Sequence, residues 1–195
     1  VRKAWNDSTR ATCELEAICR QGHTLGEGIG VWEGKPAAKR GTGDLTIGVL
    51  GHCYALNDRL ISLGLFERLR EMGAAAVTSE MLDPQLIEEA AARLPKRVFW
   101  TVGRTMVGTA LLLDQNPGVD GMIYLTCFGC GPDSMMAKII EHRVNKPFML
   151  LTVDEHSGEA GVVTRLEAFC DMLRRKRRLE LAHNLSPYGE FLYSH

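Results

Sequence analysis

Two cysteines stand two residues apart in the stretch TCFGCGPDS, residues 126 to 134. Cys127 ends an apolar run, and Cys130 precedes Gly131, Pro132 and Asp133, which are typical of a turn that opens a helix. Three roles suit such a pair: metal ligands, redox-active thiols, or small side chains that fill space. One CxxC pair is a weak signal for a metal, because it supplies two ligands and structural zinc usually takes four.

The two cysteines differ in their expected surroundings. Cys127 comes directly off the apolar run, where a thiol behaves as a small hydrophobe and burial raises its pKa. Cys130 lies at the predicted start of a helix, where backbone N–H groups and the helix dipole favour the thiolate that binds metal or reacts. We therefore predict that Cys130 is the working thiol and a metal ligand, with Cys127 as the second candidate ligand.

Other polar residues follow the remaining apolar segments of the chain, and we expect them to bind a cofactor or ligand. These residues are His52, Asn57, Arg104, Asp154, Glu155 and His156. Each has a structural interpretation as well. The histidines suit ordinary loop positions, Asp154 could cap a turn, and Asn57 with Asp58 could cap the following helix.

The chain alternates regularly between apolar and amphipathic segments from residue 45 onward. The predicted strands are 45–51, 74–80, 97–103, 121–127 and 147–154, and the predicted helices lie near 59–72, 84–93, 104–113, 133–143 and 164–182. Continuous apolar strands between helices indicate a parallel sheet covered on both faces. We predict an α/β, flavodoxin-like, doubly wound sheet of five strands in the order 2-1-3-4-5, with ligands beyond the carboxyl ends of the strands.

Local signals mark two helix starts and divide the chain. Thr164 and Glu167 match a capping box, and Asp83 followed by Pro84 matches a cap with proline in the first turn. The predicted organisation is an N-terminal helix (3–21) and glycine-rich linker within 1–44, an α/β domain over 45–182, and a C-terminal tail over 183–195. The glycine-rich stretch does not match a phosphate loop, because proline follows Gly34-Lys35.

Composition narrows the class of protein. The 195 residues are 45% hydrophobic and carry a net charge of −1, which suits one globular domain and gives no general attraction to nucleic acid. The basic run 174–178 is interpreted as a solvated helix face. No apolar run approaches the ~20 residues of a membrane span, and no signal-peptide core is visible. The six cysteines are irregularly spaced, so we expect reduced thiols in a cytoplasmic protein.

Several stretches resemble a known family. GHCYALND, KRVFWTVGR, DGMIYLTCFGCGPDS and DEHSGEAGVVTRLEAFCDML are similar to the C-terminal domain of proteins related to 2-hydroxyacyl-CoA dehydratases. The branch they resemble most is the group called acyl-CoA dehydratase activase-related, or CoA-substrate-specific enzyme activase. The resemblance covers residues 45 to about 175. The activase proper has a sugar-kinase-like fold with phosphate loops, which this sequence does not show.

The resemblance implies an oxygen-sensitive iron–sulfur protein with a [4Fe–4S] cluster. The wider superfamily includes benzoyl-CoA reductase and the double-cubane cluster proteins, and its clusters are held between α/β domains by cysteines from each. An ATP-hydrolysing activase delivers low-potential electrons to the cluster. The cysteine of the last domain maps onto Cys130, whereas Cys127 and Cys53 inherit no role. The other ligands come from preceding domains in the dehydratases. Three alternatives follow for this chain: another chain completes the cluster site, the domains with the other ligands were removed, or the protein has lost the cluster.

The resemblance leads to an expected function with two alternatives. We expect a domain or subunit that acts with other dehydratase-like domains and an activase in reduction or dehydration of an acyl-CoA thioester, incomplete as an enzyme alone. The first alternative is a zinc- or ligand-binding module that uses Cys127, Cys130, His52 and His156. The second is a structural interaction domain with inert thiols. A homo-oligomer is compatible with each of them, and no nucleic-acid or membrane partner is expected.

Overall fold

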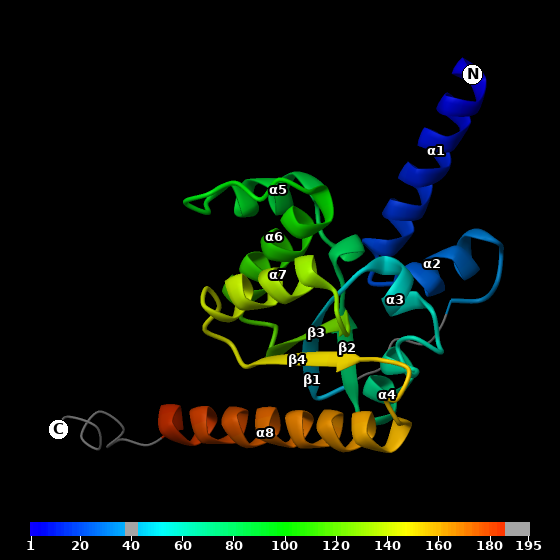
Figure 1. The fold of residues 1–195 in the computed structure, drawn as a ribbon. Coiled ribbons are helices and arrows are strands. Elements are labelled where there is room, and N and C mark those ends of the chain that lie inside the picture. The colour runs from blue at the N-terminus through cyan, green and yellow to red at the C-terminus, as the bar shows by residue number, and fades with distance from the viewer. Residues whose placement is uncertain (38–42, 186–195) are drawn as a thin grey trace.

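The computed structural model describes residues 1–37 and 43–185, and its centre is a parallel sheet of four strands in the order β2-β1-β3-β4 (Figure 1). The strands are β1 (Leu45–Leu50), β2 (Ala74–Val77), β3 (Gly121–Cys127) and β4 (Phe148–Val153). β1 lies between β2 and β3, and its last residue, Leu50, is in register with Tyr124 of β3. The predicted α/β fold with a parallel sheet is therefore confirmed.

Helices cover both faces of this sheet. On one face are α3 (Cys53–Asn57), α4 (Leu65–Glu71) and α8 (Glu159–Leu185). On the other are α6 (Thr101–Gln115) and α7 (Gly131–Glu141), with α5 (Pro84–Ala92) packed on α6 after a 3-10 turn, η1 (Ser79–Met81). Figure 1 shows α8 running along the sheet on the side opposite α5, α6 and α7. The strands read as apolar runs because both of their faces are buried under helices.

The predicted strand 97–103 is wrong. Residues 97–100 form a loop, and α6 begins at Thr101. The apolar residues that follow serve a helix, because Met106, Val107 and Ala110 recur at helical spacing and are buried against the sheet. With this segment outside the sheet, β3 takes the place next to β1. The sheet therefore has four strands in place of five, and the others keep the predicted relative order.

The N-terminal helix is confirmed as α1 (Arg2–Cys19), which projects away from the sheet (Figure 1). The predicted linker is wrong in part, because α2 (Leu25–Trp32) forms within it. Thr24 and Glu27 start α2 with a reciprocal capping box. Gly28 allows α2 to approach α1 closely, since a Cβ at that position would lie 2.8 Å from the Cys19 sulfur. Residues 38–42 of the linker and 186–195 of the predicted tail lie outside the described residues.

Of the two predicted helix N-terminal caps, one is confirmed and the other is wrong. Asp83 caps α5 by accepting a hydrogen bond from the Gln85 N–H at 2.8 Å. The capping box at Thr164 is wrong, because α8 already begins at Glu159 and the Thr164 hydroxyl donates to the Ala160 carbonyl within the helix. α4 is shorter than the predicted 59–72 helix, since it begins only at Leu65.

The basic run on α8 is only partly a solvated face. The Arg174 guanidinium donates to both carboxylate oxygens of Asp44, at 2.8 and 3.0 Å, and also to the Met72 carbonyl. Arg177 donates to the Asp44 carbonyl oxygen. These bonds fasten α8 to the residue before β1. Among the described residues, no helix has both the length and the apolar character needed to cross a bilayer.

Candidate metal centre

The polar residues singled out in the sequence follow the carboxyl ends of three neighbouring parallel strands. His52 follows β1, Cys130 follows β3, and Asp154 follows β4. Because parallel strands end at the same edge of a sheet, the three loops lie along one edge. This is the edge at which open α/β sheets bind ligands.

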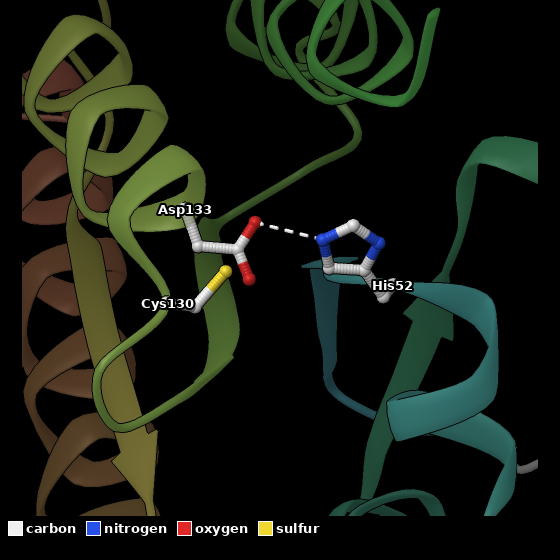
Figure 2. A group of neighbouring side chains, drawn as sticks. All are labelled: His52, Cys130 and Asp133. Atoms are coloured by element: carbon white, nitrogen blue, oxygen red, sulfur yellow. Dashed lines mark ion pairs between the residues drawn. The ribbon is translucent and has the colours of Figure 1, made fainter. Parts of the chain in front are cut away.

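Three side chains from two of these loops converge. The ligand atoms of His52, Cys130 and Asp133 all lie within 4.8 Å of one another (Figure 2). His52 Nε2 is 3.0 Å from Asp133 Oδ1. Within the described residues, this is the one place where three or more histidine, cysteine, aspartate or glutamate side chains meet with metal-ligand spacing.

Two short helices position these side chains. His52 is the N-cap residue of α3, and Cys130 is the N-cap residue of α7. Asp133 lies in the first turn of α7, three residues after Cys130, so both side chains are on the same end of one helix. A carboxylate is favoured there by the positive end of the helix dipole.

Hydroxyl groups from β3 hold the Asp133 carboxylate. The Tyr124 hydroxyl donates to Oδ1 at 2.9 Å, and the Thr126 hydroxyl donates to Oδ2 at 3.2 Å. Tyr124 is fully buried and Asp133 is only 4% exposed. The carboxylate is therefore fixed from both sides, with Oδ1 directed toward His52.

The pKa of the Cys130 thiol corrects one expectation. Burial raises this pKa above its ordinary value, and the Asp133 carboxyl raises it further, although the Asp133 backbone N–H acts in the opposite direction. The helix start favours the thiolate, but burial and the Asp133 carboxyl outweigh this effect. Because a metal cation deprotonates a thiol that coordinates it, a bound cation would reverse this preference.

Tyr54 connects the three residues to Cys127. Its ring stacks on the His52 imidazole, with centroids 5.3 Å apart. Burial raises the pKa of Tyr54, and the neighbouring Cys127, Asp133 and Cys130 groups raise it further. Cys127 is half-buried and packs against the core beneath α4 and α8, as predicted for the thiol at the strand end.

Asn57 and Arg104 have structural contacts. The Asn57 side chain donates to the Cys53 carbonyl and accepts from the Gly26 N–H, so it joins α3 to α2. Arg104 lies on the first turn of α6 rather than after a strand. Its guanidinium donates to Glu88 of α5 and to the Phe99 carbonyl.

The loop after β4 is exposed. Asp154 caps its turn by accepting from the Ser157 hydroxyl and the His156 N–H, as its structural interpretation predicted. The Ser157 hydrogen bond lowers the pKa of Asp154. The side chains of Glu155 and His156 are 81% and 85% exposed. The group that meets at the site thus contains His52 and Cys130 from the predicted zinc set, with Asp133 in place of Cys127 and His156.

Sequence reasoning missed Asp133, which we interpreted as part of a turn. A signal was present in β3, where Tyr124 and Thr126 place two hydroxyl groups on the same face of an otherwise apolar strand. Buried hydroxyls need partners, so this pair pointed to a polar group above that face.

The cysteines do not gather into one group. All six are free thiols; Cys19 and Cys170 are buried, while Cys13 and Cys53 are exposed on α1 and α3. The structure, over the residues it describes, shows no set of four cysteines that could hold an iron–sulfur cluster.

No protein-family model matches the chain, and no curated protein or solved structure shows significant similarity to it.

Proposed function

We propose that this chain is a metal-binding α/β domain in which His52, Cys130 and Asp133 bind one transition-metal ion. The observation that carries the proposal is the convergence of a nitrogen, a sulfur and an oxygen ligand within 4.8 Å of one another. They come from two different loops and lie at the ligand-binding edge of the sheet.

The donor set suits zinc or ferrous iron better than a hard cation. Thiolate and imidazole ligands favour such transition metals, whereas magnesium and calcium take oxygen ligands. In a tetrahedral zinc site, bonds of about 2.0–2.3 Å separate neighbouring ligand atoms by roughly 3.3–3.8 Å. The 3.0 Å between His52 Nε2 and Asp133 Oδ1 is already near this spacing.

Three protein ligands leave a fourth position for water or a substrate, which is the pattern of catalytic rather than structural zinc. A metal held there would act as a Lewis acid toward an oxygen ligand. The residues around it have supporting roles. Tyr124 and Thr126 orient Asp133, and Tyr54 stacks on the His52 ring. Such partners of the ligands usually raise metal affinity.

We also propose a wider role, as a domain of a 2-hydroxyacyl-CoA dehydratase-like system that acts with an ATP-dependent activase on a CoA thioester. One observation supports this role: the turn around Cys130, the residue onto which the resemblance maps a cluster ligand, is open. A Cβ added at Gly129 or Gly131 would meet no atom within 4 Å. A cluster bound there would need thiolates from another chain, because this edge presents only three of the described cysteines, Cys53, Cys127 and Cys130, and no group of four meets there.

Metal analysis after purification without oxygen tests both proposals. Zinc or iron near one ion per chain, without acid-labile sulfide, supports the single-ion site. Iron together with sulfide supports the cluster, with partner chains supplied if the isolated chain binds none. Loss of metal from His52→Ala, Cys130→Ser and Asp133→Asn, with metal retained by Cys127→Ser, assigns the ion to the three residues.

Two other outcomes count against the single-ion site. Loss of metal in Cys127→Ser alone would move the site to the other thiol. A wild-type chain that binds neither zinc nor iron at micromolar concentration would refute the site. His156→Ala is a suitable control, because its side chain is exposed and belongs to a different loop.

A further inference from the structure

The tetrapeptide Cys127–Cys130 forms a tight turn with a specific geometry. The Cys130 N–H donates to the Cys127 carbonyl at 3.2 Å, and Gly129 has a φ of +79°. A hydrogen-bonded turn with a positive φ at its third residue and none at its second, here Phe128, is a type II β-turn, which brings its first and fourth Cα atoms within about 7 Å. Disulfides join Cα atoms about 4.4–6.8 Å apart, so the turn keeps the Cα atoms of Cys127 and Cys130 within or close to the range that a disulfide needs.

The surroundings leave this pair accessible. Both cysteines are partly exposed, and the space beside Gly129 and Gly131 is open. The other cysteines lie on other elements: Cys13 on α1, Cys19 at the end of α1, Cys53 on α3 and Cys170 within α8. Cys130 thus has a second thiol within the same four-residue turn.

We propose that Cys127 and Cys130 form a reversible disulfide, and that this bond removes Cys130 from the metal centre. The first part depends only on the turn, and the second rests on the proposed function. The site would then release its metal under oxidising conditions and recover it after reduction. Cys127, which is not needed as a ligand, has the role of the resolving thiol.

The oxidant is a low-molecular-weight disulfide such as oxidised glutathione. The Cys130 thiolate attacks one sulfur of that disulfide, forms a mixed disulfide and releases the first small thiol. The Cys127 thiolate then attacks the Cys130 sulfur and displaces the second small thiol. Two cysteine thiols are oxidised by two electrons, one small disulfide is reduced, and the two cysteine protons end on the released thiols.

Peptide mapping tests the disulfide in the metal-free full chain. After incubation with oxidised glutathione, free thiols are alkylated and the protein is cleaved with trypsin, which yields the peptide 105–138 with these two cysteines alone. We expect the mass of this peptide to be two hydrogens lower than that of the reduced, unmodified peptide, and we expect it to carry neither an alkyl group nor glutathione. Glutathione on Cys13 and Cys53 shows that the oxidant reached exposed thiols. A peptide that carries glutathione on either cysteine, or that is fully alkylated, overturns the proposal.

Two glycine variants test the turn itself. Gly129→Ala strains the left-handed residue that the disulfide would lock, whereas Gly131→Ala adds the same methyl group to an equally open site without a positive φ. The equilibrium constant for disulfide formation, measured against a series of glutathione ratios, should fall about fivefold or more in Gly129→Ala. It should stay within about twofold of wild type in Gly131→Ala. Equal effects of the two substitutions would refute the turn as the cause.

A zinc-loaded sample tests the release of metal. Zinc captured by a chromogenic chelator should appear together with the disulfide and return to the protein after reduction. A disulfide that forms while zinc stays bound refutes the second part alone. If the chain binds neither zinc nor iron, the proposed function fails, while the peptide map of the metal-free protein still decides on the disulfide.

Discussion

Tyr124→Phe is the perturbation that separates a metal-binding Asp133 from a merely buried one. The substitution removes the hydroxyl that donates to Asp133 Oδ1 at 2.9 Å and leaves the buried ring in place. Oδ1 is also the oxygen nearest His52 Nε2, at 3.0 Å. Without the hydroxyl, the oxygen that faces the metal position loses its main fixed partner on β3.

Two magnitudes follow. A buried hydrogen bond to a charged group contributes about 1.5–3 kcal/mol, so the free energy of unfolding of the metal-free protein should fall by about that amount. Removing a partner of a metal ligand typically lowers metal affinity about 10–100-fold. With metal in excess over both dissociation constants, a tenfold loss of affinity removes about 1.4 kcal/mol of metal-induced stabilisation.

The assay is urea denaturation of wild type and variant, each with a chelator and with zinc, combined with competition against a metal indicator. Thr126→Val is the matched control, because its hydroxyl bonds the other oxygen, Oδ2, over a longer 3.2 Å. We expect Thr126→Val to lower stability but to change zinc affinity less than Tyr124→Phe does. Equal zinc affinity in wild type and Tyr124→Phe would refute the role of Asp133 Oδ1 as a ligand.

Three further predictions concern single residues. Because burial and Asp133 raise the Cys130 pKa in the fold, the protonated thiol stabilises the metal-free protein below the ordinary cysteine pKa of about 9, and this stabilisation is lost as the pH rises through the raised pKa. Cys130→Ser should accordingly lose less stability than wild type in alkaline chemical denaturation, and an equal loss would contradict the shift. His156→Ala should change stability by less than about 1 kcal/mol, because its side chain is 85% exposed; a larger loss in thermal denaturation would mark a structural histidine. Arg174→Ala should lower the free energy of unfolding, measured in urea, by about 1–3 kcal/mol, because the half-buried Arg174 guanidinium bonds Asp44 through two nitrogens. The exposed Arg175→Ala should lower it by less than about 0.5 kcal/mol. Similar losses for the two arginine variants would show that the Asp44 contact does not hold α8 in place.

The sequence was sufficient to predict the strands whose residues serve only to fill the buried sheet. The four observed strands are uninterrupted apolar runs, and burial on both faces requires that pattern. The run 97–103 has a similar apolar composition but does not form a strand. Its Gly103 packs on Trp100 and Val98. α6 begins at Thr101, within this run, and its apolar residues then recur at helical spacing. A short apolar run does not distinguish a strand from the start of a buried helix.

The site was predictable in part for a similar reason. The ends of β1 and β3 identified His52 and Cys130, because polar residues after buried strands stand out in a sequence. Asp133 did not stand out, since an acidic residue in the first turn of a helix is common for electrostatic reasons alone. Its contacts with Tyr124 and Thr126 depend on how α7 packs on β3, which local sequence does not specify.

The site can form because the segment 97–103, wrongly predicted as a strand, does not separate β1 from β3. Leu50 of β1 is in register with Tyr124 of β3, so His52, two residues further along, lies at the level of Thr126 and beside the Cys130 turn. Neighbouring strands are about 4.8 Å apart, and a strand formed by 97–103 between β1 and β3 would have separated them by roughly twice that distance. His52 Nε2 could not then lie 3.0 Å from Asp133 Oδ1. Residues 97–103 lie outside the sheet, in the loop before α6 and in its first turn, and this is the feature of the fold that brings His52 to Cys130 and Asp133.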